Sequence, residues 1–120
     1  MTEPTDYYES CTQLLPGAAA AYEEFHRAVP GRIDRSLRAA GVLGWKIYLR
    51  GDVLTHCVTV EDRERMDAIL DADPTGPWWL AQANRFLVSG ASPEVRRPLG
   101  RLIWDLDWPT RETRAPEPHP

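Results

Sequence analysis

The sequence has few of the features that mark specialised protein classes. It contains only two cysteines, Cys11 and Cys57, and they form neither a CxxC motif nor a metal-ligand spacing, which argues against a disulfide framework. No apolar run approaches the roughly 20 residues that span a bilayer. The first residues, MTEPTDYYE, are too acidic and polar for a signal peptide. We therefore expect a cytoplasmic protein with no membrane partner.

The chain also lacks an excess of positive charge. It has 14 Lys and Arg against 18 Asp and Glu, a formal net charge of −4. Nucleic-acid-binding proteins usually present a basic surface, so we expect no nucleic-acid partner. The three histidines lie far apart in sequence, with no carboxylate placed among them. We expect neither a bound metal nor an organic cofactor.

Tryptophan, in contrast, is abundant. The chain has five, and four of them follow residue 77. A large apolar ring with one polar N–H suits cores and ligand pockets. The apolar share of 42% and the charged share of 27% are ordinary for a globular protein, and 120 residues can form one domain with its own core. The composition thus indicates a single globular domain.

Hydrophobic periodicity predicts one domain at residues 8–108, between segments at 1–7 and 109–120 that we expect to be disordered. Strands are expected at 8–15, 44–50, 53–60 and 102–108, and helices at 18–29, 33–40, 61–72 and 78–87. Gly51 and Asp52 predict a hairpin turn, and Gly41 is placed as a helix C-cap. Alternation puts His56 on the apolar face of its strand, and it groups Leu102, Trp104, Leu106 and Trp108 on one face of the last strand.

The order of these elements is β, α, β, β, α, β, with a short extra helix before the last strand. That order predicts an α+β fold of the ferredoxin-like split βαβ type, an antiparallel four-stranded sheet with helices on one face. The other face of such a sheet is left partly uncovered. We therefore expect two sheets to pair in a homodimer.

The stretch AYEEFHR contains the most suggestive pair of side chains. Tyr22 and His26 are four residues apart, so a helix places them on one face, one turn apart. A histidine with a pKa near 6.5 can give or take a proton at neutral pH. The stripe of Ala18, Tyr22, Phe25 and Val29 explains the helix but not the histidine.

Several motifs in this order resemble the L-rhamnose mutarotase family. They are Pro16 followed by Tyr22 and His26, the strand Ile47-Tyr48-Leu49, the pair Trp78-Trp79, and the strand Ile103-Trp104-Asp105-Leu106. The resemblance covers about residues 8 to 107. It implies a small dimeric α+β barrel isomerase that uses a small-molecule substrate and no cofactor.

The resemblance also implies roles for individual residues. The residue like His26 acts as proton donor in that family, and the residue like Tyr22 contacts the sugar. The position of Trp45 and the tandem Trp78 and Trp79 line the pocket, and Tyr48 on the second strand is a further candidate substrate contact.

This chain departs from the family pattern at several polar positions. Pro30-Gly31-Arg32 replaces a usual Trp-Pro-Glu, Gly44-Trp45 replaces Asn-Tyr, and Thr59 replaces a Glu. His56 occupies a position that is usually small or apolar. The resemblance thus implies retained proton chemistry in a more aromatic pocket with fewer groups to hold sugar hydroxyls.

Other interpretations of the same residues stay open. His56 is either a hydrogen-bonded core residue or, with its pKa lowered by apolar neighbours, a base and substrate contact. Trp45 is core or pocket. Trp79 fits the core stripe, which leaves Trp78 for the pocket or a dimer contact, and Trp104 and Trp108 are assigned to sheet or dimer packing.

Three functions remain in competition. The first is a sugar mutarotase acting on a 6-deoxyhexose such as L-rhamnose. The second is a repurposed relative, a cyclase, isomerase or cofactor-free oxygenase acting on an aromatic or polyketide-like intermediate, which rests on fold analogy. The third is a non-enzymatic module that binds a small molecule in the same pocket.

Overall fold

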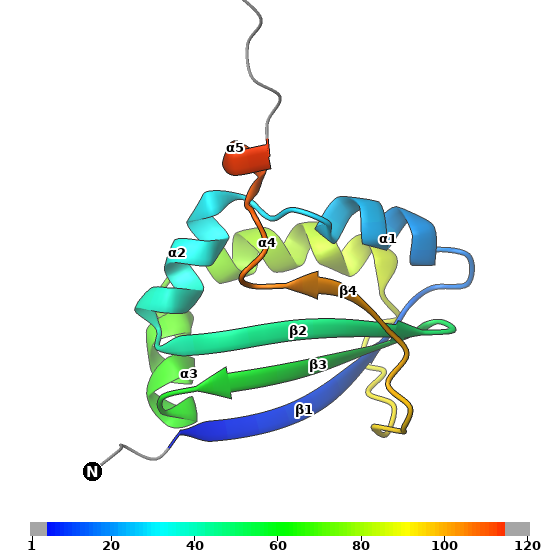
Figure 1. The fold of residues 1–120 in the computed structure, drawn as a ribbon, viewed down its shortest axis with the longest axis horizontal. Coiled ribbons are helices and arrows are strands. Elements are labelled where there is room, and N and C mark those ends of the chain that lie inside the picture. Colours follow the sequence, from blue (N-terminus) through cyan, green and yellow to red (C-terminus); the bar gives the residue numbers. More distant parts are fainter. Residues whose placement is uncertain (1–4, 115–120) are drawn as a thin grey trace, which may run out of the picture.

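A four-stranded antiparallel sheet organises the part of the chain that the computed structural model describes, residues 5–114. Its strands are β1 (Asp6–Gln13), β2 (Val42–Arg50), β3 (Val53–Val60) and β4 (Arg101–Asp105). They lie in the order β1-β3-β2-β4, so β1 and β4 form the two edges. Figure 1 shows β4 uppermost and β1 lowest in this stack. The predicted α+β fold with a four-stranded antiparallel sheet is confirmed.

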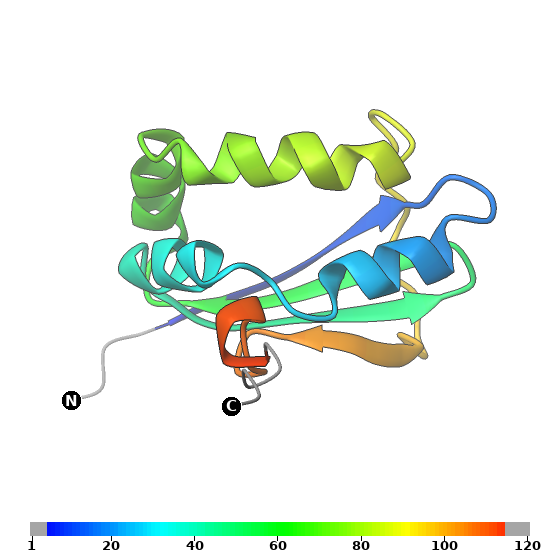
Figure 2. The same ribbon diagram turned by 90° about the horizontal axis from the view of Figure 1, so that it is seen from above.

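Helices precede and follow the central hairpin. They are α1 (Ala19–His26), α2 (Gly31–Ala39), α3 (Arg63–Asp71), α4 (Thr75–Ala83), a 3-10 turn at Asn84–Phe86, and the short α5 (Arg111–Arg114). Figures 1 and 2 show α1 and α2 above the β4–β2 edge and α4 set back behind the sheet. The Asp62 side chain accepts a hydrogen bond from the Arg65 N–H at 3.1 Å and caps α3.

The hairpin of β2 and β3 follows the alternation of the sequence. Arg50 pairs with Val53 across the Gly51–Asp52 turn, and Ile47 pairs with His56. Ile47 is 1% exposed, so its direct cross-strand neighbour His56 lies on the core face, as alternation predicts. Gly41 follows Ala40, the residue after the end of α2, and its φ of +90° confirms the predicted capping glycine.

The last strand differs from the predicted alternation. Tyr48 pairs with Leu102 and Ile47 with Trp104, so Ile103 is an extra residue in β4. Such a bulge moves the following side chains to the opposite face. Leu102 is therefore exposed, while Ile103 and Trp104 are both buried. The expectation that Leu102 shares a face with Trp104 was wrong, because alternation assumes an uninterrupted ladder.

Three further elements have boundaries that differ from those expected from the sequence. Helix α4 begins at Thr75, so Pro77 lies in its first turn instead of in a loop. The first N–H groups of a helix have no partner within the helix, so proline is tolerated there. Strand β1 begins at Asp6 and α5 covers 111–114, inside segments expected to be disordered. In those segments, residues 1–4 and 115–120 lie outside the described residues.

Contacts with α1 and α2 explain the order in the C-terminal segment. The Arg111 guanidinium donates to the carbonyl oxygens of Ala28 at 2.8 Å and Phe25 at 3.0 Å, at the C-terminal end of α1. The Gly31 N–H at the start of α2 donates to Glu112 at 2.7 Å. Each charge faces the helix end that attracts it. These contacts fasten α5 beside the junction of α1 and α2.

Gly100 is a point where the backbone conformation decides stability. Its φ is +100°, and a Cβ there would clash with the carbonyl oxygen of Leu49 in β2. We predict that Gly100→Ala lowers the free energy of unfolding by about 2 kcal/mol or more, measured by urea denaturation. Gly76→Ala is the matched control, because a Cβ added there would have no neighbouring atom within 4 Å. Equal stability of the two variants would contradict this prediction.

Candidate active site

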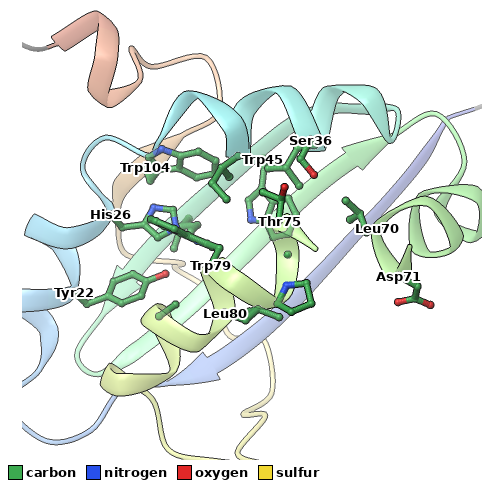
Figure 3. A pocket seen from close by; sticks show the side chains of 16 residues that line it. Tyr22, His26, Ser36, Trp45, Leu70, Asp71, Thr75, Trp79, Leu80 and Trp104 are labelled. Atoms are coloured by element: carbon green, nitrogen blue, oxygen red, sulfur yellow. The ribbon is translucent and has the colours of Figure 1, made fainter. Parts of the chain in front are cut away.

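A cavity of about 360 Å³ lies between the core face of the sheet and α1, α2 and α4. This size is within the usual range for small-molecule sites. Its wall is mostly apolar and aromatic, as shown by its larger side chains Tyr22, His26, Ile33, Leu37, Trp45, Ile47, Leu70, Trp79, Leu80 and Trp104. Asp71 lies at the end away from His26 (Figure 3). The cavity therefore offers apolar contact area and few polar side chains.

Helix α1 brings Tyr22 and His26 together at the wall of this cavity. The two residues are 3% and 5% exposed, and their rings are stacked with centroids 5.3 Å apart. In Figure 3 the Tyr22 hydroxyl points into the space between α1 and α4. The spacing of four residues predicted this shared face, and the structure shows that the face is turned inward.

Two tryptophans complete the surroundings of His26. The Trp104 ring meets the imidazole edge-on at a centroid distance of 4.8 Å, and the Trp79 ring does so at 5.5 Å. Strand alternation predicts sheet or dimer packing for Trp104, yet this residue lies beside the histidine and lines the cavity. Its place in the strand motif that resembles the mutarotase family could have identified Trp104 as a cavity residue.

The aromatic surroundings determine the charge state of His26. Burial disfavours the imidazolium and lowers the pKa of His26 to about 3; the positive charge of Arg111 acts in the same direction, and His56 would do so in its protonated form. Its Nδ1 is buried and has no hydrogen-bond partner among residues 5–114. Burial also raises the pKa of Tyr22 above its ordinary value. Both side chains are therefore neutral at physiological pH.

The other predicted site residues are spread over different parts of the fold. Trp45 and Trp79 line the cavity. Trp78 is 40% exposed and lies outside the lining, with the Arg32 guanidinium 4.2 Å from its ring centroid. Tyr48 alternates with the buried Ile47 and Leu49, so it faces the opposite side of the sheet. The structure thus separates Trp78 and Tyr48 from the group around His26.

His56 lies behind the wall of the cavity. Its Nδ1 is 3.3 Å from the indole nitrogen of Trp45, and its Nε2 is 3.1 Å from the Thr12 hydroxyl. Burial lowers its pKa to about 4. It is not among the lining residues. These contacts favour the hydrogen-bonded core interpretation over a base that touches substrate.

Within residues 5–114, no group of three or more His, Cys, Asp or Glu side chains is placed to hold a metal ion. In the same part of the chain, no helix combines the length and apolar character needed to cross a membrane.

Comparisons with known proteins agree with the motif order. Residues 8–103 match the profile of a family described as L-rhamnose mutarotase. An L-rhamnose mutarotase of Verminephrobacter eiseniae (strain EF01-2) is 36% identical over 75 residues, which cover 59% of this chain and 69% of that protein. One from Burkholderia ambifaria (strain MC40-6) is 27% identical over 94 residues, covering 76% and 89%. No solved structure gives a significant match. The profile spans most of the chain, and the chain therefore belongs to the L-rhamnose mutarotase family.

Proposed function

We propose that this protein is an isomerase that interconverts the anomers of a cyclic sugar hemiacetal, L-rhamnose or a related 6-deoxyhexose. The family assignment supports an isomerase-type enzyme, and the relatives it matches are named L-rhamnose mutarotases. The observation that carries the proposal is the neutral Tyr22–His26 pair at the wall of an aromatic cavity. His26 of this pair can accept and return a proton, and Tyr22 can donate a hydrogen bond, without a cofactor.

His26 is the proton carrier in this proposal. Mutarotation removes a proton from the anomeric hydroxyl, breaks the bond between the anomeric carbon and the ring oxygen, and protonates that oxygen. A neutral imidazole has one unprotonated nitrogen that can accept the first proton. Because both sugar oxygens are bonded to the anomeric carbon, the imidazolium formed can return its proton to the ring oxygen. Closure from the other face reverses these steps, and His26 ends as it began.

The environment of His26 suits a proton that is held only briefly. Burial among Tyr22, Trp79 and Trp104 disfavours the imidazolium. The neutral ring is therefore a weaker base than a free histidine, and its imidazolium is a stronger acid that readily gives the proton to the ring oxygen. Tyr22 keeps its own proton, since burial raises its pKa. Its hydroxyl is therefore available to donate a hydrogen bond to a sugar oxygen.

The aromatic wall supplies the binding surface. Trp45 and Trp79 both line the cavity, and a flat indole ring packs well against the apolar face of a pyranose. The same wall would accept a planar aromatic molecule, so it does not favour one substrate class. The family match favours an isomerase, and nothing in the comparisons supports a cyclase.

His26→Gln should remove the catalysis while preserving much of the side-chain volume. We expect the enzyme-dependent rate of anomer exchange of L-rhamnose to fall about 100-fold or more, because general acid–base catalysis contributes factors of that size. Tyr22→Phe keeps the ring and loses one hydroxyl, so a smaller loss of about tenfold is expected. Saturation-transfer NMR measures the exchange at equilibrium.

The control for these variants is Glu24→Gln on the same helix. Glu24 pairs with Arg27 at the surface and is 73% exposed at its side chain, so the exchange rate should not change. If the wild-type protein does not accelerate the anomer exchange of L-rhamnose, or of any other hexose or deoxyhexose, the proposal fails.

We also propose that the chain forms a homodimer through the sheet face that lies away from the cavity. Pairing and hydrogen bonds place Tyr7, Glu9, Cys57 and Tyr48 on this face. Tyr7 is 59% exposed and Leu102 37% exposed. Exposed large apolar side chains on one surface favour association.

Light scattering coupled to gel filtration tests this assembly. The wild-type protein should give a mass twice that of the 13.6 kDa chain. Leu102→Asp should shift it toward the monomer, because a desolvated carboxylate at the interface is unfavourable. Leu15→Asp is the control, since Leu15 is 41% exposed outside the strands. A monomeric wild-type protein at micromolar concentration would rule the dimer out.

A further inference from the structure

His56 joins three strands of the sheet through its two ring nitrogens. On β2, the Trp45 indole nitrogen lies 3.3 Å from Nδ1; on β1, the Thr12 hydroxyl lies 3.1 Å from Nε2. An indole N–H can only donate, so Nδ1 must be the unprotonated acceptor. The proton of the neutral ring is then on Nε2, and the Thr12 hydroxyl accepts it. The tautomer with its proton on Nε2 therefore fits both hydrogen bonds in this chain of contacts.

Trp45 is the member of this chain of contacts that reaches the cavity. Trp45 lines the cavity, whereas His56 and Thr12 do not. The rings of Trp45 and His56 meet edge-on, with centroids 6.0 Å apart and planes at 82°. Rotation of the indole about its side-chain torsions would break its hydrogen bond to Nδ1. The position of this part of the wall therefore depends on a residue that lies behind it.

We propose that His56 is a positioning residue, which fixes the orientation of the Trp45 indole against the substrate without touching the substrate itself. The step is conformational and transfers no proton. It deepens the proposed function, because the affected wall is that of the same cavity. The kinetic part of its test therefore rests on the mutarotase proposal, whereas the structural part does not.

The charge state of His56 supports this role. A protonated Nδ1 would face the indole N–H with no acceptor between them. The lowered pKa of His56, about 4, keeps the ring neutral at physiological pH. His26 is the titratable group whose pKa responds to the charge of His56, and it is neutral too. Since both nitrogens of His56 are engaged, neither is free to act as a base on a bound sugar.

Two amide substitutions at His56 distinguish the role of Nδ1 from that of Nε2. The His56→Asn variant would place an amide oxygen near the position of Nδ1 and could still accept from Trp45, whereas the longer side chain of His56→Gln reaches toward the position of Nε2. The probe is hydrogen exchange of the Trp45 indole N–H in ¹⁵N-labelled protein, with its signal identified by its loss in Trp45→Phe. We expect similar exchange in wild type and His56→Asn, and exchange about tenfold faster in His56→Gln.

Kinetics of anomer exchange provide the second readout. His56→Gln should raise KM about three- to tenfold and change kcat less than twofold, because a mobile wall weakens binding more than it alters the proton transfer. His56→Asn should restore KM to near the wild-type value. Trp45→Phe, which keeps a ring and removes the N–H, should raise KM by a similar factor. In that background His56→Gln should add nothing further, since the two changes remove one interaction.

Several results would overturn the proposal. Equal indole exchange in the Asn and Gln variants would show that the bond does not hold Trp45. A fall in kcat of more than about 100-fold in both variants would instead identify His56 as a catalytic base. If His56→Gln does not fold, a wild-type KM in Trp45→Phe would still refute the role of the bond. If no sugar is turned over, the mutarotase proposal fails, and indole exchange alone decides the positioning proposal.

Discussion

The burial of a neutral imidazole among aromatic rings is the constraint on which the site depends. Desolvation of His26 by Tyr22, Trp79 and Trp104 outweighs the tendency of histidine to become charged. The rings come from α1, α4 and β4, so the site exists only when these elements are packed together. The same contacts that form the core therefore determine the protonation state of His26, and in the proposed mechanism stability and catalysis depend on one set of side chains.

The supporting contacts follow from this constraint. Arg111 holds the C-terminal end of α1 through two carbonyl oxygens and lies 5.4 Å from the Trp79 ring centroid. Ser36 on α2 donates to Asp73 at 2.5 Å, which ties α2 to the loop before α4. His56 connects β1, β3 and the Trp45 wall. These polar contacts thus connect the elements that surround the cavity.

Patterns that depend on local geometry were predictable from the sequence. A spacing of four residues put Tyr22 and His26 on one helical face, strand alternation put His56 on the core face, and Gly41 marked a helix end. The first two follow from the 3.6 and 2.0 residue periods of regular structure, and the third follows from the positive φ that glycine adopts at a helix end. The order of the elements then gave the fold class.

Features that depend on distant partners were not predictable in the same way. The bulge at Ile103 arises from the pairing of β4 with β2 and turns Trp104 toward His26. Helix α5 has four residues and persists through contacts of Arg111 and Glu112 with α1 and α2. Sequence periodicity predicts neither the bulge nor helix α5, because the residues that stabilise them lie far away in the sequence.

In the proposed mechanism, catalysis is performed by a histidine that is neutral before the sugar arrives. The pH dependence of the enzyme-catalysed anomer exchange rate tests this claim most directly. Because the lowered pKa of His26 is about 3, almost all His26 side chains are already neutral at pH values well below 6.5. The catalysed rate should therefore be constant between about pH 8 and pH 5. A loss of rate with an inflection near pH 6.5, in protein that remains folded, would contradict it.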